Sequence, residues 1–453
     1  MPTGRSTRCS RTASTWARTT RSSSATSAPL TGTPAPGSSS TSCRPDVTDA
    51  ARPIVSVLVP CWNSAGSIER ALDSVLEERG VALECVVVDD GSTDGTLDMV
   101  RAVAARDPRV VVLALPDNQG VSNARNRGLE LVRGDWLTLL DADDRFLPGG
   151  LGRLAAVALG GDAAAVIGQQ VWWNGRRRWR TPQYDVGDIR RPGRKSLATS
   201  PGLLYFVSPH AKLLHRGCWQ GLEFHGRVLG DQPWIIRALL RAGDRIEVLG
   251  DTVYEWYRPA ASVPSTSITA TTRSSVRRGV EAVSVATEAL ASVREEAARH
   301  LDVAASERVA ASYAERLLHS DLAAHVGRAL DRADPEIDLL FDAIREFVAG
   351  LPTTDITGSD ALARNILEPP LRRWNRLGDT GRAAYWQLFE TAHGTDPNLF
   401  RHGANPFDRL GLRLVAGGRS GVRLAAARTL LLIARFVALG RRAVRVGLGA
   451  ARA

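Results

Sequence analysis

A chain of 453 residues is long enough for about two or three domains with a substantial core. Its hydrophobic share of 44% and charged share of 23% are ordinary for a globular protein, which excludes a chain that is disordered throughout. The net charge of +10 lies mainly at the two ends and in one hairpin, with no nucleic-acid-binding motif between them, so it does not indicate a nucleic-acid-binding protein.

The first 52 residues differ from the rest of the chain in composition. Residues 1–52 are mainly Ser, Thr, Pro, Ala and Arg, with almost no large aliphatic side chains. Such a segment buries too little apolar surface to offset its chain entropy, so we expect it to be disordered and without a function of its own. A start codon assigned too far upstream would give the same composition.

From residue 53 onward, short apolar runs alternate with segments of helical periodicity. The pattern predicts strands over 54–59, 83–88, 109–115 and 136–140. It predicts helices over 67–78, 96–105 and 121–132, the first with Ser67 as its N-cap and Arg70 among its exposed positions. Strands that alternate with helices through short turns predict a parallel sheet with right-handed crossovers.

The fourth of these strands ends abruptly at three acids. The apolar run 136–140 is followed by Asp141, Asp143 and Asp144, at the end of a strand where open α/β sheets bind ligands. Carboxylates packed this closely repel one another, and a hard divalent cation with oxygen ligands relieves that repulsion. A solvated acidic turn is the plainer interpretation of such a motif in isolation.

Similar polar residues follow the earlier strands. Asp89 and Asp90 come after the second strand, where one of them can accept a hydrogen bond from the imide N–H of uracil or a similar base. Trp62, after the first strand, offers a flat face for the same base. Asn118 and Gly120 precede a helix that carries Arg125, and a helix N-terminus and a guanidinium both suit diphosphate oxygens. Each signal is weak alone, but together they predict one site.

The second half of the sheet begins after Pro148 with a small helix and a strand over 164–173. Asn174-Gly175 then predicts a tight hairpin turn, with a return strand over 176–180 that carries four arginines and Trp179. This basic hairpin could bind a polyanion, although an exposed edge strand protected by charge is the plainer explanation. Residues 190–200 are predicted to form a loop.

The rest of the chain divides into three further parts. The segment 203–212, a helix over 232–241 and two strands over 245–249 and 252–257 complete the first domain. Residues 260–275 are rich in Ser and Thr and are predicted to be a linker, and the segment from 276 to about 393 reads as several helices. We therefore expect a sheet domain over 53–259, a helical module over 276–410 and a basic tail over 411–453.

Four motifs in the sheet domain resemble family 2 glycosyltransferases of the GT-A fold. They are VSVLVPCWN at 55–63, VVVDDGSTDGT at 86–96, NQGVSNARNRGL at 118–129 and GDWLTLLDADD at 134–144, in the family's order and spacing. The resemblance implies a mostly parallel α/β sheet flanked by helices. It also implies a nucleotide-diphospho-sugar donor, a UDP-sugar first of all, and direct displacement at the anomeric carbon with inversion.

The resemblance also implies roles for particular residues. It places Trp62 and Asp90 at the base and Asp141 near the ribose, and we expect Pro60, Asp89, Asn118 and Arg125 to be donor-binding residues as well. Asp143, together with Asp144, would hold the Mn²⁺ or Mg²⁺ that neutralises the diphosphate and acts as a Lewis acid on the leaving group.

The acceptor half is a looser match to the same family. PHAKLLHRGCW at 209–219 and LGDQPW at 229–234 resemble family segments, and the second implies that Asp231 is the general base that deprotonates the acceptor hydroxyl. Gly230 stands where the family has Glu, which leaves the pKa of Asp231 less easily raised. Asp231 could equally be the N-cap of the helix over 232–241. His210, His215 or His225 could add a nitrogen ligand to the metal, but hydrogen bonding is the commoner role.

The tail and the cysteines bear on location. From Arg413 onward there are nine arginines and no acid, and Arg428, Arg435 and Arg442 repeat every seven residues opposite an apolar face. This pattern is typical of a helix lying on an anionic membrane, with packing against the helical module as the rival. Five cysteines without a CxxC pair, no signal-peptide segment and no long apolar run favour the cytoplasm, with the protein peripheral on the inner face of the cell membrane.

The sequence thus predicts a metal-dependent, inverting glycosyltransferase of cell-envelope biosynthesis, acting on a glycan, lipid-linked or polyol-phosphate acceptor. A catalytically weakened protein that binds a sugar nucleotide or glycan in the same pocket is the alternative, and Gly230 is the only residue that supports it. We expect no nucleic-acid partner.

Overall fold

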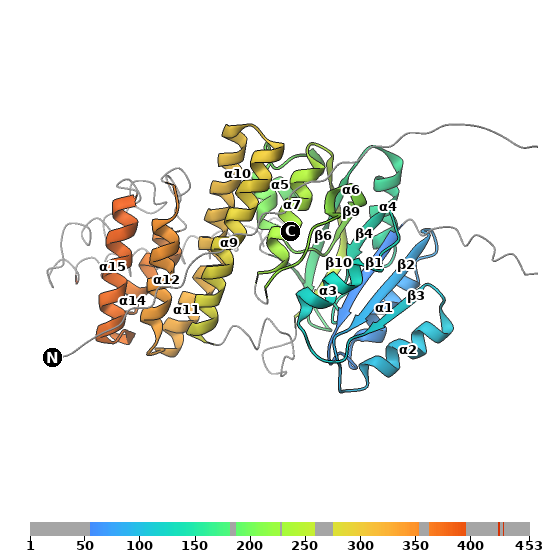
Figure 1. Ribbon diagram of the computed structural model, residues 1–453, viewed down its shortest axis with the longest axis horizontal. Coiled ribbons are helices and arrows are strands. Elements are labelled where there is room, and N and C mark those ends of the chain that lie inside the picture. The colour runs from blue at the N-terminus through green and yellow to red at the C-terminus, as the bar shows by residue number, and fades with distance from the viewer. Residues whose placement is uncertain are drawn as a thin grey trace, which may run out of the picture. The chain divides into compact units, whose positions relative to one another are not determined.

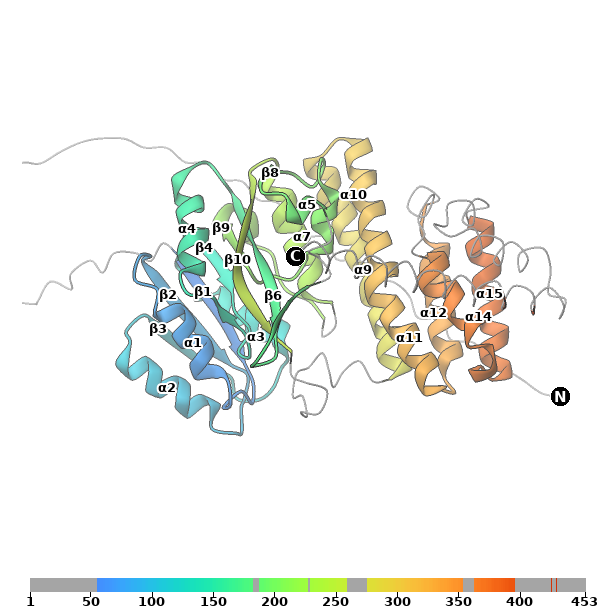
Figure 2. The same cartoon turned by 180° about the vertical axis from the view of Figure 1, so that it is seen from behind.

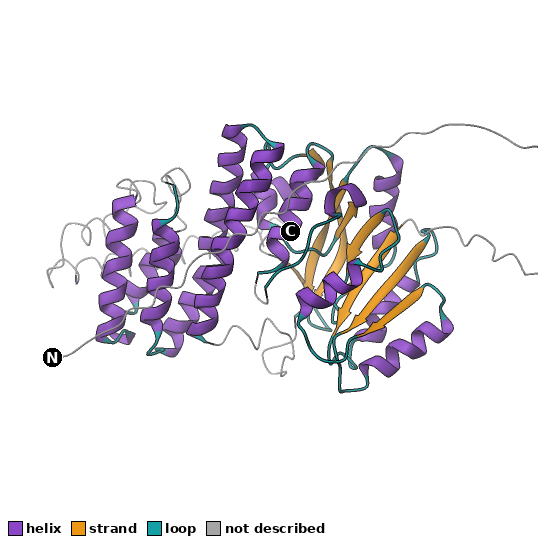
Figure 3. Ribbon diagram, viewed as in Figure 1, coloured by secondary structure: helices purple, strands orange, loops and turns teal. Residues whose placement is uncertain are grey.

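The structure is a computed structural model in which residues 55–181, 187–226, 229–258, 275–352 and 362–395, with positions 425 and 429, are described. Within these residues one mixed sheet is flanked by helices and is followed along the chain by a helical region (Figures 1 and 3). The predictions for residues 1–52, for the linker up to 274 and for the basic tail concern segments outside the described residues, apart from those two tail positions.

The first half of the sheet domain follows the predicted order of elements. These are β1 (Val55–Cys61), α1 (Ile68–Leu76), β2 (Leu83–Asp89), α2 (Thr96–Arg106), β3 (Val110–Ala114), α3 (Val121–Leu129) and β4 (Trp136–Leu139). The four strands are parallel in the order β3-β2-β1-β4, and every residue of β1 and β2 is buried. Continuous apolar runs rather than alternation form these strands because helices cover both faces.

The chain reverses direction across the sheet between β3 and β4. Helices α1 and α2 connect strands that progress from β1 to β3, whereas α3 returns to the other side of β1. Right-handed crossovers therefore place α3 on the opposite face from α1 and α2, as Figures 1 and 2 show. Sheets of this class bind ligands outside the carboxyl ends of the two strands that flank such a reversal, which are β1 and β4 here.

Helix α1 departs from the sequence prediction at two residues. Ser67 precedes the helix but its side chain makes no capping hydrogen bond, and its Oγ donates to Ser64 O instead. Arg70 is half-buried rather than exposed, because its Nη2 donates to Asp143 O and its guanidinium lies over the rings of Trp173 and Tyr257. Helical periodicity predicts that Arg70 faces solvent, but the acidic turn after β4 covers it.

The second half of the sheet contains short antiparallel strands around a parallel pair. Its elements are β5 (Arg145–Phe146), α4 (Gly150–Gly160), β6 (Ala165–Trp173), β7 (Arg178–Arg180), α5 (Gly187–Arg190), β8 (Gly193–Lys195), η2 (Pro201–Tyr205), β9 (Lys212–His215), α6 (Arg216–Trp219), α7 (Asp231–Ala242) and β10 (Ile246–Tyr257). The sheet continues from β4 through β9, β6 and β10 to β5. β6 and β10 are parallel to each other. β9 lies between β4 and β6 and is antiparallel to both.

Three predictions in this half meet different outcomes. The hairpin at Asn174-Gly175 is confirmed, with Gly175 at φ 92° and β7 antiparallel to β6. The loop expected over 190–200 is wrong in part, since it contains β8, which pairs with β10. The two strands expected over 245–249 and 252–257 are one strand, β10, in which the register shifts between Val248 and Thr252. Gly250-Asp251 produces an irregularity in the strand rather than a turn.

The helical region consists of packed helices, as expected. It contains α9 (Val276–His300), α10 (Val303–Arg316), η3 (Leu317–Leu322), α11 (Ala323–Arg332), α12 (Ile337–Ala349), η4 (Leu362–Leu367), α14 (Glu368–Arg372), η5 (Trp374–Arg376) and α15 (Asp379–Thr395). Ser275 and Asp302 cap α9 and α10 through their side chains. None of the described helices is long and apolar enough to cross a membrane.

Candidate active site

The loops after β1 and β2 are joined by hydrogen bonds to the side chain and the backbone of one residue. Asn63 Oδ1 accepts from Thr93 N at 2.8 Å, and the backbone N–H of Asn63 donates to Ser92 Oγ at 2.9 Å. Asn63 adopts φ 47°, a left-handed conformation that Asn tolerates. Within this frame Pro60 is buried in β1, while Trp62 is 41% exposed and free to present its indole to a ligand.

The two acids after β2 are buried and hydrogen-bonded. Asp90 accepts from Gln119 N at 2.9 Å and Gly120 N at 2.8 Å, and so fixes the segment that leads into α3. Asp89 accepts from Ser92 N at 3.1 Å and lies 3.8 Å from the thiol of Cys61. Each carboxylate has about four lone-pair positions, so Asp90 can accept a further hydrogen bond from the N–H of a nucleotide base.

Gly91 is a site residue that the sequence prediction did not single out. It adopts φ 68°, and a Cβ at this position would lie 2.6 Å from the backbone carbon of Asp117. Only glycine therefore allows the loop after β2 to pack against the segment before α3. The DDG pattern carries this signal, because a glycine after two acids at a strand end indicates a turn with positive φ.

Helix α3 connects Asp90, in the loop after β2, to the acids after β4. Its Arg125 is 5% exposed and donates from Nη2 to Asp141 Oδ1 at 3.1 Å, with Phe224 under the guanidinium at 5.3 Å. Asn118 is exposed, and its side chain makes no hydrogen bond with a described residue. The structure thus joins Arg125 to Asp141 and leaves Asn118 open to solvent.

The three acids after β4 have different environments. Although burial disfavours a charged carboxylate, His210 and Arg125 hold the pKa of Asp141 well below its usual range. Burial and the charge of Asp141 raise the pKa of Asp143 to about 6. Burial and the charges of Asp143 and Asp141 raise the pKa of Asp144 well above its usual range. A nearby cation would favour the ionised form of all three.

His210 and Tyr254 complete this acidic cluster from distant parts of the chain. His210 Nε2 lies 2.9 Å from Asp141 Oδ2, and its ring stacks on Tyr254 at 5.3 Å between centroids. Tyr254 donates its hydroxyl to Asp144 Oδ2 at 2.8 Å. Neither ring nitrogen of the buried His210 makes a well-oriented hydrogen bond with a described residue.

Ligand atoms of Asp141, Asp144 and His210 all lie within 4.8 Å of one another, which suits a divalent cation. Asp143 is outside this group of three, and its role as a ligand stays a prediction. Within the described residues the donor set of two carboxylates and one imidazole fits Mn²⁺ better than Mg²⁺, which prefers oxygen ligands.

Asp231 lies in the first turn of α7 rather than before it. The N-cap position belongs to Gly230, with no side-chain cap, so the interpretation of Asp231 as an N-cap is wrong. Asp231 is half-buried near Lys212, whose Nζ donates to Ser208 O at 2.7 Å. Burial lowers the pKa of Lys212 well below its usual range, and the charge of Asp231 opposes that shift.

The residues on either side of Asp231 are tightly packed. A Cβ at Gly230 would lie 2.1 Å from His225 O, so this position cannot hold the glutamate that the resemblance implies unless the loop moves. On the other side, Gln232 Oε1 accepts from Arg316 Nη1 at 2.7 Å and from Tyr313 OH at 3.1 Å. The helical region therefore contacts the start of α7 next to Asp231.

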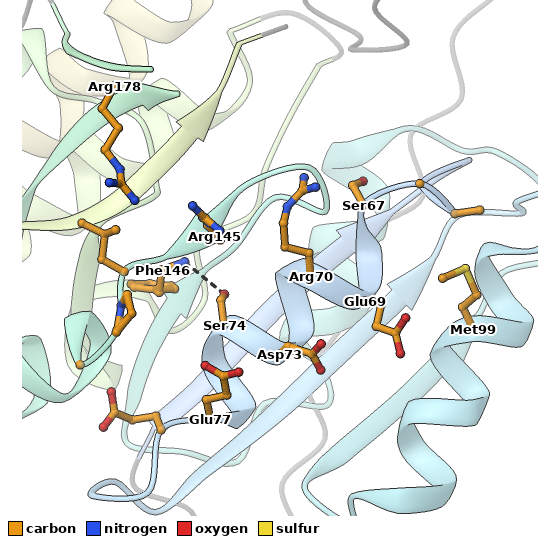
Figure 4. A pocket seen from close by; sticks show the side chains of 16 residues that line it. Ser67, Glu69, Arg70, Asp73, Ser74, Glu77, Met99, Arg145, Phe146 and Arg178 are labelled. Atoms are coloured by element: carbon orange, nitrogen blue, oxygen red, sulfur yellow. Dashed lines mark hydrogen bonds between the residues drawn. The ribbon is translucent and has the colours of Figure 1, made fainter. Parts of the chain in front are cut away.

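A separate cavity of about 730 Å³ lies along α1 and β5, outside the predicted donor residues. Figure 4 shows Arg70, Arg145 and Arg178 along one side of this cavity, and acids of α1 along the other. Arg70 links the cavity to the acidic turn through its hydrogen bond to Asp143 O. The cavity is therefore a neighbour of the candidate site rather than the site itself.

Comparison with known proteins identifies the domain that carries this site. The family model described as Glycosyl transferase family 2 matches residues 56–220, which include β1 to α6 but end before Asp231. Similarity to the succinoglycan biosynthesis protein ExoO of Rhizobium meliloti is 45% identity over 102 residues, or 22% of this chain and 29% of ExoO. The glycosyltransferase GlyG of Streptococcus pneumoniae is 25% identical over 226 residues, covering 47% of this chain and 73% of GlyG.

The fold has a solved counterpart. The crystal structure of S. aureus TarS 1-349 in complex with UDP-GlcNAc superimposes with a TM-score of 0.56 at 21% identity, covering 78% of this chain and 93% of that one. This likeness includes the sheet and part of the helical region, and it confirms the predicted GT-A-like arrangement with helices after the sheet.

Proposed function

The chain belongs to glycosyl transferase family 2 through residues 56–220, and from this membership we propose that it transfers a sugar from a nucleotide-diphospho-sugar to an acceptor hydroxyl. The observation that carries the proposal is the position of Asp141 at the carboxyl end of β4, contacted by Arg125 from α3 and by His210. Acid, guanidinium and imidazole from three segments meet at the crevice where this sheet class binds nucleotides.

The donor site is assigned from base to diphosphate. Trp62 stacks on the base, worth roughly 1–3 kcal/mol by analogy with nucleic-acid bases, and Asp90 accepts its imide N–H, with Pro60 and Asp89 supporting the two loops. Asp141 binds the ribose. Arg125, Asn118 and the N-terminus of α3 face the diphosphate, since a guanidinium and free backbone N–H groups both favour an anion.

Asp143 and Asp144 would hold Mn²⁺ or Mg²⁺, and the nearness of the Asp144, Asp141 and His210 ligand atoms to one another supports an ion at Asp144. When bound, the cation supplies Lewis-acid stabilisation of the charge that develops on the leaving diphosphate. The pKa of Asp144 is raised by burial first and then by the charges of Asp143 and Asp141, and a cation beside these carboxylates would oppose both effects.

The reaction is a single displacement with inversion. Asp231 accepts the proton of the acceptor hydroxyl, the acceptor oxygen forms a bond to the anomeric carbon, and the bond from that carbon to the diphosphate oxygen breaks. The nucleoside diphosphate leaves with the bonding electron pair, and Arg125 stabilises its charge. The acceptor is a glycan, lipid-linked or polyol-phosphate molecule of the cell envelope.

The test is substitution of Asp231 by asparagine in the purified full-length protein. We expect transfer from a sugar nucleotide to fall by a factor of about 10²–10⁴, the usual contribution of a general base, while the dissociation constant of the donor stays unchanged. Donor turnover would be followed by release of nucleoside diphosphate, and donor binding by calorimetry.

The competing function is a sugar-nucleotide or glycan-binding protein without transfer activity, which the absence of an acid at position 230 favours. Wild-type protein that binds donors but releases no nucleoside diphosphate with any acceptor would support that function instead. Donor turnover that persists undiminished in Asp231→Asn would remove Asp231 from the mechanism.

A further inference from the structure

The basic hairpin rises from the same edge of the sheet as the candidate active site. β4 and β6 are each antiparallel to β9, which lies between them, so β6 runs in the same direction as β4. β10 is parallel to β6 and therefore shares this direction. The carboxyl ends of β6 and β10 therefore lie on the side of the sheet where β4 delivers Asp141. Trp172, Trp173 and Trp256 occupy these ends.

Aromatic rings and guanidinium groups pack against one another at this edge. Trp172 is 6.1 Å from Trp179 and 6.5 Å from Trp256, measured between ring centroids. The guanidinium of Arg258 lies 4.4 Å from the ring of Trp172. Trp179 is 39% exposed, so its indole combines a fixed position with an open face. We call Trp172, Trp179, Trp256, Arg178 and Arg258, with the hairpin tip Arg176 and Arg177, the arginine–tryptophan surface.

Among the described residues, the ion pairs at this surface leave positive charge in excess. Arg145 and Arg178 both bind the single carboxylate of the fully buried Glu255, which leaves one positive charge in excess. Arg176 and Arg177 are exposed at the hairpin tip, and their guanidinium groups form no ion pair with any described residue. A cluster of this kind concentrates anions near the sheet edge.

The surface continues into the acidic turn after β4. Tyr257, which pairs with Trp173 across β10 and β6, donates its N–H to Asp144 Oδ1 at 2.7 Å. Arg70 donates to Asp143 O at 3.0 Å and lies 5.3 Å from the ring of Trp173. A polymer lying along the hairpin would therefore approach the site where the donor sugar is transferred.

We propose that the arginine–tryptophan surface binds an anionic acceptor glycan, with sugar units against Trp179 and phosphate or carboxylate groups against the arginines. This inference rests on the proposed function and adds to it that the acceptor is charged. Protection of an edge strand requires charge alone, whereas an exposed indole among arginines combines the contacts that an anionic sugar polymer needs.

The experiment compares binding of four labelled oligomers to the full-length protein at two salt concentrations. They are a poly(glycerol phosphate) oligomer, an oligogalacturonate, a neutral maltooligosaccharide of the same length and a single-stranded oligonucleotide of the same charge. We expect one or both anionic glycans to bind at least about tenfold more tightly than the neutral one, with affinity falling as salt rises. The two anionic glycans distinguish phosphate from carboxylate as the charged group.

Two variants assign the binding to this surface. Arg176→Glu combined with Arg177→Glu keeps the hairpin tip charged but reverses the sign of the charge. We expect this variant to bind the anionic glycans about tenfold or more weakly than the wild type. Trp179→Ala should weaken binding of the anionic and the neutral glycans alike, while the salt dependence of binding stays unchanged. Arg101→Ala on helix α2, an exposed arginine whose ion pair is with Asp98 of the same helix, is the control, and circular dichroism checks that each variant is folded.

The outcomes separate this inference from the proposed function. Equal affinity for charged and neutral glycans, or unchanged affinity in the Arg176/Arg177 variant, overturns the inference while leaving donor binding intact. Tighter binding of the oligonucleotide than of either anionic glycan also overturns it, since the surface would then be a nucleic-acid site. Failure of the wild-type protein to bind any sugar nucleotide would overturn the proposed function itself.

Discussion

Single residues at the start of α7 decide how the acceptor side is built. Gly230 has an ordinary φ of −65°, so no backbone requirement selects glycine there. Steric contact selects it instead, because a Cβ would lie 2.1 Å from His225 O and 2.9 Å from Ser122 Oγ. The departure from the family's acid is thus explained by the close passage of residues 222–226 between α3 and α7.

Substitution of Gly230 by alanine tests this explanation. We expect the free energy of unfolding to fall by about 1–3 kcal/mol, because overpacking must displace a backbone carbonyl. The midpoint of thermal unfolding measures this change. Gly66→Ala is the matched control, since nothing lies within 4 Å of a Cβ at that position, and an equal loss in both variants would show that contact with His225 is unimportant.

The sequence located the acids of the site better than their partners. Asp89, Asp90 and Asp141 were predictable because strand ends in a parallel sheet must meet at one edge. The sequence could not choose His210 from the three candidate histidines and did not indicate Tyr254, because their contacts with Asp141 and Asp144 join segments about 70 and 110 residues apart. Only the fold determines that these segments are neighbours.

At the scale of elements, α10 supports the start of α7 through one buried polar network. Arg316 donates to Gln232 Oε1 and binds Asp321, while Tyr313 donates to the same Gln232 oxygen. Gln232 follows Asp231 directly, so this network fixes the backbone that carries the proposed base. Arg316 is a positioning residue, because it reaches the reaction only through Gln232.

Replacing Arg316 by methionine keeps the apolar stem and removes the hydrogen bond. We expect kcat to fall by about tenfold or more with the donor dissociation constant unchanged, since a small misplacement of a catalytic group slows the reaction strongly. Arg308→Met on the exposed side of α10 is the control. A lower unfolding temperature with kcat preserved in the folded fraction would show that the network serves stability alone.

The contact between α7 and α9 predicts a dependence of stability on pH. Glu296 of α9 is buried between Arg237 and Arg241 of α7, at 3.1 and 2.7 Å. Although burial opposes ionisation, hydrogen bonds from these arginines and from His300 lower the pKa of Glu296 to about 2, below its unfolded value of 4.5. The ion pairs therefore stabilise the fold fully above about pH 4.5, and this stabilisation is lost as pH falls towards 2.

Glu296→Gln measures this contribution. We expect it to lower the free energy of unfolding by about 2–3 kcal/mol at pH 7, with the difference from wild type narrowing between about pH 4.5 and 2. Thermal unfolding followed across that range provides the comparison, and Glu295→Gln, on the exposed side of the same helix, should have little effect at any pH. A constant difference at all pH values would contradict the assigned pKa.

Elements were predictable where apolar runs were long and continuous. The four parallel strands β1 to β4 and the three helices between them match the sequence pattern closely. The prediction failed at β8, a strand of three residues without an apolar run, and at Gly250, where one glycine suggested a turn inside β10. Pairing with neighbouring strands, rather than local sequence, decides both cases.

For the molecule as a whole, the proposed donor site, the acidic cluster and the arginine–tryptophan surface share one edge of the sheet, formed by the carboxyl ends of its parallel strands. The directions of the strands place the carboxyl ends of β1, β2, β4, β6 and β10 on that edge. Helix α7 brings Asp231 close to Lys212, the first residue of β9. The sequence predicted the first three strand ends from their motifs. It could not predict that β6 and β10 would run in the same direction as β4, because that follows from the antiparallel pairing of β9 with β4 and β6 and from the parallel pairing of β10 with β6.

The most direct test of the central claim is a calorimetric titration of UDP-GlcNAc into the full-length protein, with and without Mn²⁺. We expect the wild type to bind UDP-GlcNAc more tightly with Mn²⁺ than without it, Asp143→Ala to lose this difference, and Arg106→Ala to keep it. Absence of binding for UDP-GlcNAc and for other sugar nucleotides under both conditions, or equal Mn²⁺ dependence in Asp143→Ala and the wild type, would contradict it.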